Sequence, residues 1–232
     1  MAQPPEHNET FLREVDENLR RDQLRDFGKK YGGWLAAAVV VFLIASGGFI
    51  YWKQYKEQRS EKQVEQLAET FRTIGSGTPS AATLKQLDDF SKDGSKGIRA
   101  TALFTRAALA LQQNDVKLAT AKYREIAENK GFPQPYRDAA LLRQTALEFD
   151  TLQPQQVVSR LQPLAKPGNP WFGTAGEMTA MALIKQGQPA QAAQLFAAIS
   201  KDKSVPDSIR ARSVQIAGTL GVDASGAFTP AQ

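Results

Sequence analysis

Two segments, Asn114–Ile126 (NDVKLATAKYREI) and Gly187–Ile199 (GQPAQAAQLFAAI), decide how most of this chain folds. They lie 73 positions apart, and each begins with turn-forming residues and continues into a helical pattern. An alanine, an aromatic residue four positions later and an isoleucine three positions after that recur in both: Ala119 with Ala192, Tyr123 with Phe196, and Ile126 with Ile199. This spacing places the three residues on one face of a helix. Each segment therefore predicts a helix that starts at a turn and packs through that face.

The match continues on both sides of these segments, where Ala107 corresponds to Ala180, Pro133 to Pro206 and Arg137 to Arg210. A third helix junction fits at Leu152, followed by a helix over 154–165. Junction spacings of 38 and 35 residues, from 114 to 152 to 187, are close to the period of about 34 residues that is typical of tetratricopeptide repeats. We therefore predict an all-α domain in which helical hairpins stack into a tetratricopeptide-like α-solenoid. A generic helical bundle with chance matches is the alternative.

A different stretch, Gly32–Trp52, contains no charged residue. A bilayer core of roughly 30 Å needs about 20 apolar residues in a helix. Aromatic residues stand at both ends of the stretch, as membrane interfaces favour. We predict a single transmembrane helix over 31–52; a buried helix of a soluble core is the alternative. A cleaved signal peptide is disfavoured, because the preceding tail is long and acidic and the apolar run continues beyond Ala45-Ser46-Gly47.

These patterns divide the chain into four predicted parts. Residues 1–30 form an N-terminal tail with a short amphipathic helix, 31–52 the transmembrane helix, 53–222 the tetratricopeptide-like domain and 223–232 a flexible C-terminal tail. The basic residues nearest the apolar stretch slightly favour a cytoplasmic tail and a domain on the outer side. They are Arg20, Arg21, Arg25, Lys29 and Lys30 before it, and Lys53, Lys56, Arg59 and Lys62 after it.

Composition argues against several classes of function. The 232 residues include no cysteine and a single histidine, His7. Thiolate metal sites, cysteine nucleophiles and histidine-based catalytic or metal sites are therefore not available. The net charge is +5, but the basic residues are dispersed, whereas nucleic-acid binding requires a clustered patch. We expect no enzymatic activity, no cofactor, no metal and no nucleic-acid partner.

Three short motifs carry a resemblance to a known family: Phe11–Glu17 (FLREVDE), Lys30–Gly33 (KYGG) before the apolar stretch, and Tyr51-Trp52 at its end. Together with the order of tail, membrane helix and degenerate hairpins, they make the chain similar to the YfgM-like family over about residues 10–222. That family provides the ancillary subunit of the bacterial Sec translocon. Its motifs are short, and it has no catalytic residues to transfer to this chain.

The resemblance implies a single-pass protein of the bacterial inner membrane, with a cytoplasmic N-terminus and a periplasmic C-terminal domain. It also implies three kinds of partner: Sec translocon subunits, a membrane-anchored periplasmic prolyl isomerase or chaperone, and exported polypeptides. The implied function is a scaffold that assists the handover of exported proteins. A tetratricopeptide scaffold for another cell-envelope assembly, in division or outer-membrane biogenesis, is the alternative.

The stacked hairpins also predict a protein-binding groove on the face formed by their first helices. Phe104 and Met181 are its most informative members, because adaptable apolar side chains suit an extended or partly folded partner. For both residues a place in the core is the alternative. The predicted groove residues are Thr101, Phe104, Ala108 and Gln112 in one hairpin, and Thr174, Glu177, Met181 and Lys185 in another.

Overall fold

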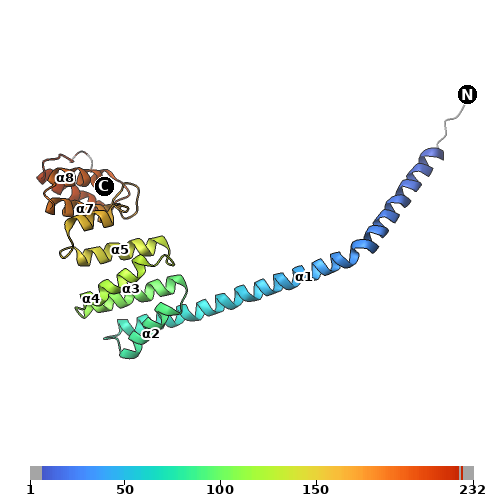
Figure 1. The fold of residues 1–232 in the computed structure, drawn as a ribbon, viewed down its shortest axis with the longest axis horizontal. Helices are drawn as coiled ribbons and strands as arrows, with labels where there is room; N and C mark the ends of the chain where they lie inside the picture. Colours follow the sequence, from blue (N-terminus) through green and yellow to red (C-terminus); the bar gives the residue numbers. More distant parts are fainter. Residues whose placement is uncertain (1–6, 225, 227–232) are drawn as a thin grey trace, which may run out of the picture. The chain divides into compact units, whose positions relative to one another are not determined.

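The structure is a computed structural model that describes the backbone of residues 7–224 and 226. It describes the side chains of residues 33–224 and 226, except those of 35, 36, 39, 56, 57, 59 and 60. Within this part the chain is helical and contains no strand, which confirms the all-α prediction (Figure 1). The helices are α1 (His7–Gly75), α2 (Ala81–Lys92), α3 (Lys96–Gln112), α4 (Val116–Glu128), α5 (Gln134–Glu148), α6 (Pro154–Leu161), α7 (Phe172–Lys185), α8 (Pro189–Lys201) and α9 (Asp207–Thr219).

The chain forms two compact units, the first ending at Glu61 and the second beginning at Lys62. The described part of the first unit, residues 7–61, is the N-terminal part of helix α1. The sequence left open whether the tail helix lies apart from the apolar stretch or runs into it, and helix α1 runs unbroken from His7 to Gly75. Its sequence contains no proline, and its glycines, which include the pairs Gly32-Gly33 and Gly47-Gly48, each cost only about 1 kcal/mol in a helix. Residues 1–6 lie outside the described part.

Large apolar side chains of α1 are exposed within the first unit, among them Trp34, Phe42 and Ile44, each at least 70% exposed. Judged by length and hydropathy, none of the helices in the described part meets the requirements for crossing a bilayer. The predicted span 31–52 includes residues 31, 32, 35, 36 and 39, whose side chains lie outside the described set. The transmembrane helix therefore stays a prediction.

The second unit is a row of helices in which neighbours along the chain pack on one another. Helices α2, α3, α4 and α5 pack in sequence, and so do α6, α7, α8 and α9; α3, α4 and α5 lie side by side in Figure 1. The last turns of α1 belong to this unit: Leu67 and Thr70 are buried, and the side-chain amide of Gln63 donates a hydrogen bond to the carbonyl oxygen of Asp93 (2.7 Å).

Local sequence explains where several helices begin. The side chains of Ser80, Ser95 and Asp115 each accept a hydrogen bond from the backbone N–H three residues later, which is the usual role of an N-cap residue. Proline occupies the first turn of α5, α6 and α8, where its missing N–H costs no hydrogen bond. Helix α1 ends at Gly75, where the sequence Gly75-Ser76-Gly77-Thr78-Pro79 contains residues that oppose a helix.

The matched residues of the repeat occupy the core. Ala107, Ala180, Ala119 and Ala192 are fully buried, so their helices approach closely at these positions. The aromatic residues Tyr123 and Phe196 and the isoleucines Ile126 and Ile199 are each at most 2% exposed. Two separate core clusters form around the two hairpins, one containing Tyr123 and the other Phe196. Because the matched residues of both hairpins are buried in equivalent positions, the alternative of a generic helical bundle with chance matches is not supported.

The turns inside the two hairpins also match in backbone conformation. Asn114 and Gly187 both have positive φ, 59° and 74°, a conformation that asparagine and glycine adopt most readily. The next N–H bonds back in the same way: Asp115 to the oxygen of Ala110 (2.8 Å), and Gln188 to that of Leu183 (2.9 Å). The sequence offset of 73 residues is therefore a structural repeat.

The same correspondence continues into the loops that lead to α5 and α9. Gly131 N–H donates to the side-chain oxygen of Asn129 (2.8 Å), and Ser204 N–H donates to that of Asp202 (2.9 Å). The hydrogen bond from the Ser204 hydroxyl (2.6 Å), together with the one from the Ser204 N–H, lowers the pKa of Asp202. After each loop a proline carbonyl, of Pro133 or Pro206, accepts the first hydrogen bonds of the following helix.

The middle hairpin, α5 with α6, is the least regular. We expected α6 to reach residue 165, but it ends at Leu161. Pro163 explains the difference, because it lacks the N–H that would continue the hydrogen-bond ladder of the helix. The apolar residues of this segment are nevertheless buried: Val157, Leu161 and Leu164 are at most 3% exposed. Helix α6 packs mainly on α7 and touches α5 at few points.

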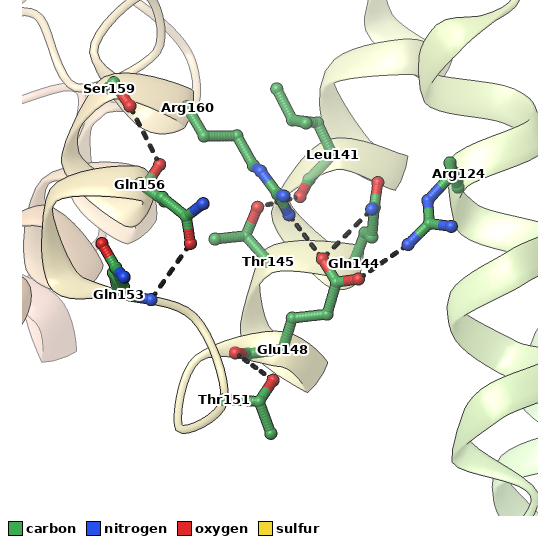
Figure 2. A network of polar contacts seen from close by, with 10 residues as sticks. All are labelled: Arg124, Leu141, Gln144, Thr145, Glu148, Thr151, Gln153, Gln156, Ser159 and Arg160. Atoms are coloured by element: carbon green, nitrogen blue, oxygen red, sulfur yellow. Dashed lines mark hydrogen bonds and ion pairs between the residues drawn. The ribbon is translucent and has the colours of Figure 1, made fainter.

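A polar network around Glu148 joins α5 to its neighbours at this point (Figure 2). The carboxylate accepts hydrogen bonds from Arg124 of α4 (2.9 Å), Arg160 of α6 (2.5 Å) and Gln144 of its own helix (3.1 Å). Burial alone would raise the pKa of Glu148, but the hydrogen bond and charge of Arg160, with the hydrogen bonds from Arg124 and Gln144, outweigh it and lower the pKa. Where α5 and α6 touch at few points, one carboxylate connects three helices.

The packed part of the chain also extends beyond Val222, the expected end of the domain. Val222 N–H donates to the carbonyl oxygen of Ala217 (2.9 Å), and Ala224 is 4% exposed in the cluster that contains Phe196. The described core therefore includes Ala224, while the flexible tail over 223–232 stays a prediction. Residues 225 and 227–232 lie outside the described part.

Candidate protein-binding pocket

Helices α5, α7 and α9, the first helices of successive hairpins, enclose a pocket of about 470 Å³ together with one residue of α8. This volume lies in the range of about 300–1,000 Å³ that is typical of ligand sites in proteins. Met181 is 42% exposed, so the pocket is accessible from solvent. Its lining residues are Ala146, Phe149, Asp150, Glu177, Met178, Met181, Phe196, Arg212 and Ile216.

Close packing fixes the position of α7, which supplies three of the lining residues. A β-carbon on Gly173 would lie 2.7 Å from Val205 Cγ1, and one on Gly176 would lie 2.8 Å from Ile199 Cδ1. Real β-carbons do not approach other atoms this closely, so any larger residue would push the helices apart. Gly173 therefore allows α7 to approach the start of α9 and the residue Val205 before it, and Gly176 allows α7 to approach α8. The backbone that carries the pocket is therefore held by the core.

Most of the pocket surface is apolar. The fully buried ring of Phe196 belongs to the core cluster beneath, while Phe149, Ile216 and the two methionines Met178 and Met181 line the sides. Methionine side chains are flexible and polarizable, so they adapt to apolar partners of different shape. The pocket is suited to an apolar group rather than to a charged small molecule.

Two ion pairs stand beside this apolar surface. Arg212 of α9 donates two hydrogen bonds to Glu177 of α7, both 2.7 Å long, and this contact raises the pKa of Arg212. Lys185, at the end of α7, donates to Asp150 (2.7 Å), and its ammonium nitrogen lies 4.4 Å from the centre of the Phe149 ring. The two pairs join α7 to α9 and α7 to the end of α5.

Three of the four groove residues predicted on α7 lie at this pocket. Glu177 and Met181 line it, and Lys185 pairs with the lining residue Asp150. Thr174 is exposed on the same helix but does not line the pocket. Because the Met181 side chain is exposed, a place in the groove explains this residue better than a place in the core.

The four groove residues predicted on α3 do not lie at this pocket. Ala108 and Gln112 are exposed and Thr101 is half-buried. The half-buried ring of Phe104 lies 5.8 Å from that of Tyr123, and the guanidinium of Arg143 lies 5.6 Å from its centre. The structure therefore places Phe104 largely against the core, and the α3 part of the groove stays a prediction.

Sequence reasoning did not identify the residues that α5 and α9 contribute, chiefly Phe149, Asp150, Arg212 and Ile216. They are far from α7 in the sequence. The repeat itself contained a signal: an offset of 73 aligns Ile216 with Arg143, which contacts Phe104, and aligns Phe104 with Glu177. The offset aligns α3 with α7 and α5 with α9. The residues of α9 that face α7 can therefore be read from the residues of α5 that face α3.

Metal-binding geometry is not found here: among the described residues, no group of three or more histidine, cysteine, aspartate or glutamate side chains is placed to hold a metal ion. The arrangement instead defines a class of protein, an all-α scaffold of stacked helical hairpins with a pocket on the face of the first helices. The model of the tetratricopeptide repeat-like domain family matches residues 25–216, and this chain belongs to that family. No curated protein and no solved structure gives a significant match.

Proposed function

We propose that this chain is a membrane-anchored scaffold that associates with the Sec translocon and periplasmic chaperones and assists the handover of exported proteins. Membership of a tetratricopeptide repeat-like family indicates a protein-interaction scaffold. The observation that carries the proposal is the accessible, mainly apolar pocket on the face of the first helices, lined by two methionines. Such a surface suits polypeptide segments that have not yet buried their apolar side chains.

The proposed anchor is the stretch 31–52 of helix α1. Its sequence is free of charge between Lys30 and Lys53, and its described apolar side chains are exposed rather than packed. Such a surface is stable in a lipid environment and unfavourable in water. In this proposal the N-terminus is cytoplasmic and the helical domain is periplasmic, in the inner membrane of a bacterium.

The proposed partners follow from the similarity of the N-terminal motifs and the element order to the YfgM-like family. Helix α1 would contact integral subunits of the translocon through its apolar stretch. The helical domain would contact exported polypeptides and a membrane-anchored prolyl isomerase or chaperone. The two activities are then carried by separate units of the chain, which allows them to be tested separately.

Site-specific photo-crosslinking in living cells tests the proposal. A photoreactive amino acid at Ala37 or Ser46, within the apolar stretch, is expected to form adducts with Sec translocon subunits, identified by mass spectrometry. The exposed Gln113, in the turn after α3, provides a control position at which no translocon adduct is expected. Adducts with division or outer-membrane assembly proteins alone, or no translocon adduct from either position, would overturn the proposal.

A further inference from the structure

We propose that the helical domain contains a hinge between Leu152 and Gln153, about which helices α2–α5 and helices α6–α9 rotate as two bodies. This rotation opens and closes the pocket, and the ion pairs of Glu148 with Arg160 and of Asp150 with Lys185 hold it closed. The inference goes beyond the proposed scaffold function, because it concerns how the pocket opens and does not depend on which partner occupies it.

The packing along the row of helices is interrupted at one junction. Helix α5 packs extensively on α4, and α6 packs extensively on α7, but α5 touches α6 and α7 at few points. Close-packed interiors resist deformation, so each half of the row is expected to move as one body. Rotation at the junction between α5 and α6 disturbs the least packing of any break in this row.

The backbone hydrogen bonds divide at the same place. The N–H groups of Thr151 and Leu152 both donate back to the carbonyl oxygen of Glu148, at 3.0 and 2.9 Å. The N–H of Gln153, in contrast, donates forward to the side-chain oxygen of Gln156 in α6 (3.1 Å). The turn before this point thus belongs to α5 and the residues after it belong to α6, which is the local arrangement that a hinge between two bodies requires.

Apolar contact across the junction provides a pivot. Leu142 of α5 is buried in the same cluster as Val157 and Leu161 of α6. The burial of apolar surface is non-directional, so this contact tolerates a small change of angle between α5 and α6. It therefore keeps the two halves together without fixing their relative orientation.

Directional contacts across the junction come from the two ion pairs, each with one partner in each half. Glu148 at the end of α5 accepts from Arg160 of α6 at 2.5 Å, and Asp150 accepts from Lys185 of α7 at 2.7 Å (Figure 2 shows the first pair). Ion pairs that are partly exposed contribute little stability, so both can break while the domain stays folded. The Arg160 side chain is 27% exposed and that of Asp150 is 89% exposed.

Breaking the pair with Arg160 leaves no buried charge without a partner. Glu148 keeps its hydrogen bonds from Arg124 of α4 (2.9 Å) and Gln144 of α5 (3.1 Å), which lie in the same half of the domain. The large cost of burying an unpaired carboxylate is therefore avoided in the open arrangement. This distribution of donors makes Glu148 suited to a contact that forms and breaks.

The pocket lies across the junction, and this connects the hinge to binding. Ala146 and Phe149 line it from the end of α5, whereas Met181, Arg212 and Ile216 line it from α7 and α9. Rotation at the hinge therefore changes the separation of its two walls. A partner that binds both walls favours the closed arrangement, because a ligand shifts a conformational equilibrium toward the state that it binds more tightly.

Distances between spin labels test the hinge, since the absence of native cysteine allows labels to be placed in pairs on introduced cysteines. Distance distributions are measured by pulsed electron paramagnetic resonance on the full-length chain in lipid nanodiscs. Exposed positions Gln113 and Gln194 form the pair that crosses the junction. Lys92 with Gln113, and Gln194 with Gln215, are pairs of exposed positions within one half.

The double variant E148Q/D150N should broaden the distance distribution of the crossing pair by about twofold or more and leave the two other pairs unchanged. D150N alone should broaden it in the same way but less, because one ion pair remains. E125Q is the matched control: it removes a carboxylate that pairs with Lys122 inside α4, and it should change none of the three distributions.

Thiol reactivity tests whether the hinge opens the pocket. Met178 lines the pocket and is half-buried, so Met178→Cys should react with a maleimide about threefold faster or more in the E148Q/D150N background. Ala192 is fully buried between helices of the same half, so Ala192→Cys should stay unreactive in both backgrounds.

Three results would overturn the inference. The first is a crossing pair whose distribution is unchanged in E148Q/D150N and in D150N. The second is equal broadening of all three pairs with reaction of Ala192→Cys, which would mean that the ion pairs hold the fold itself. The third is an unchanged reaction rate of Met178→Cys while the crossing pair broadens, which would mean that the rotation does not open the pocket.

Discussion

Arg212 and Glu177 join α9 to α7 beside the pocket through two parallel hydrogen bonds, each 2.7 Å long. The Glu177 side chain is only 17% exposed, whereas that of Arg212 is 54% exposed. A bidentate pair of this kind restricts both side chains to one geometry. It therefore contributes to the distance between α7 and α9 as well as to the charge of the pocket edge.

Replacing Arg212 by leucine should destabilise the helical domain by about 1–2 kcal/mol, because the mostly buried Glu177 loses both of its hydrogen-bond donors. The loss is measured by thermal unfolding of the full-length chain in detergent micelles, followed by circular dichroism. Arg72→Leu is the matched control: its partner Glu69 is one turn away on α1, and both side chains are more than 60% exposed. Equal shifts for the two variants would contradict the role given to Arg212.

The Glu148 network predicts a dependence of stability on pH. The pKa of Glu148 is lower in the folded state than its usual value, so the folded protein binds fewer protons at this group than the unfolded chain. Its contribution to stability is therefore present above the usual glutamate pKa and is lost as the pH falls through the lowered value. Urea unfolding is measured for the wild type and E148Q between pH 7 and about pH 3. The difference between their free energies of unfolding should decrease as the pH is lowered.

E125Q serves as the control for this measurement, because Glu125 pairs with Lys122 on the surface of a single helix. E148Q should destabilise the domain by about 1–2 kcal/mol at neutral pH, whereas E125Q should have an effect below about 0.5 kcal/mol. A pH-independent difference between wild type and E148Q would show that the carboxylate charge does not hold α4, α5 and α6 together.

The alanines of the repeat predict a packing effect. Ala192 is fully buried on α8, so Ala192→Leu should cost about 1–3 kcal/mol through overpacking. Ala190→Leu lies two residues earlier on the same helix at an exposed position and should have little effect. Similar melting temperatures for the two variants would mean that α7 and α8 do not cross closely at Ala192.

The absence of native cysteine makes the proposed membrane topology testable. Ser76→Cys introduces a single exposed thiol just after α1, and Gln3→Cys introduces one near the N-terminus. A membrane-impermeant maleimide should label Ser76→Cys in intact spheroplasts and label Gln3→Cys only after lysis. Labelling of both variants before lysis, or of Gln3→Cys alone, would contradict the proposed orientation.

The sequence predicted the helical hairpins well, because their determinants are local and occur twice. The 73-residue offset identified the buried pairs Ala119 with Ala192 and Tyr123 with Phe196, and even the positive-φ turn positions Asn114 and Gly187. It left open whether the tail helix runs into the apolar stretch, and α1 proves continuous because its glycines oppose a helix too weakly to end it. The early end of α6 was also missed, although Pro163 provided a signal.

The pocket was predicted only in part. Glu177, Met181 and Lys185 were found because they face outward on the first helix of a recognisable repeat. Asp150 and Arg212 were missed, because their importance comes from tertiary pairing with residues 35 positions away in the sequence. Sequence periodicity identifies the face of a helix, but it does not show which distant side chain pairs with it.

Photo-crosslinking from Met181 tests most directly whether the pocket is the binding surface of this scaffold. A photoreactive amino acid at Met181 is compared in living cells with one at Gln194, an exposed position on α8, and the adducts are identified by mass spectrometry. Exported polypeptides or periplasmic chaperones should be crosslinked from Met181 and not from Gln194. The same adducts from both positions, or adducts from Gln194 alone, would contradict the account.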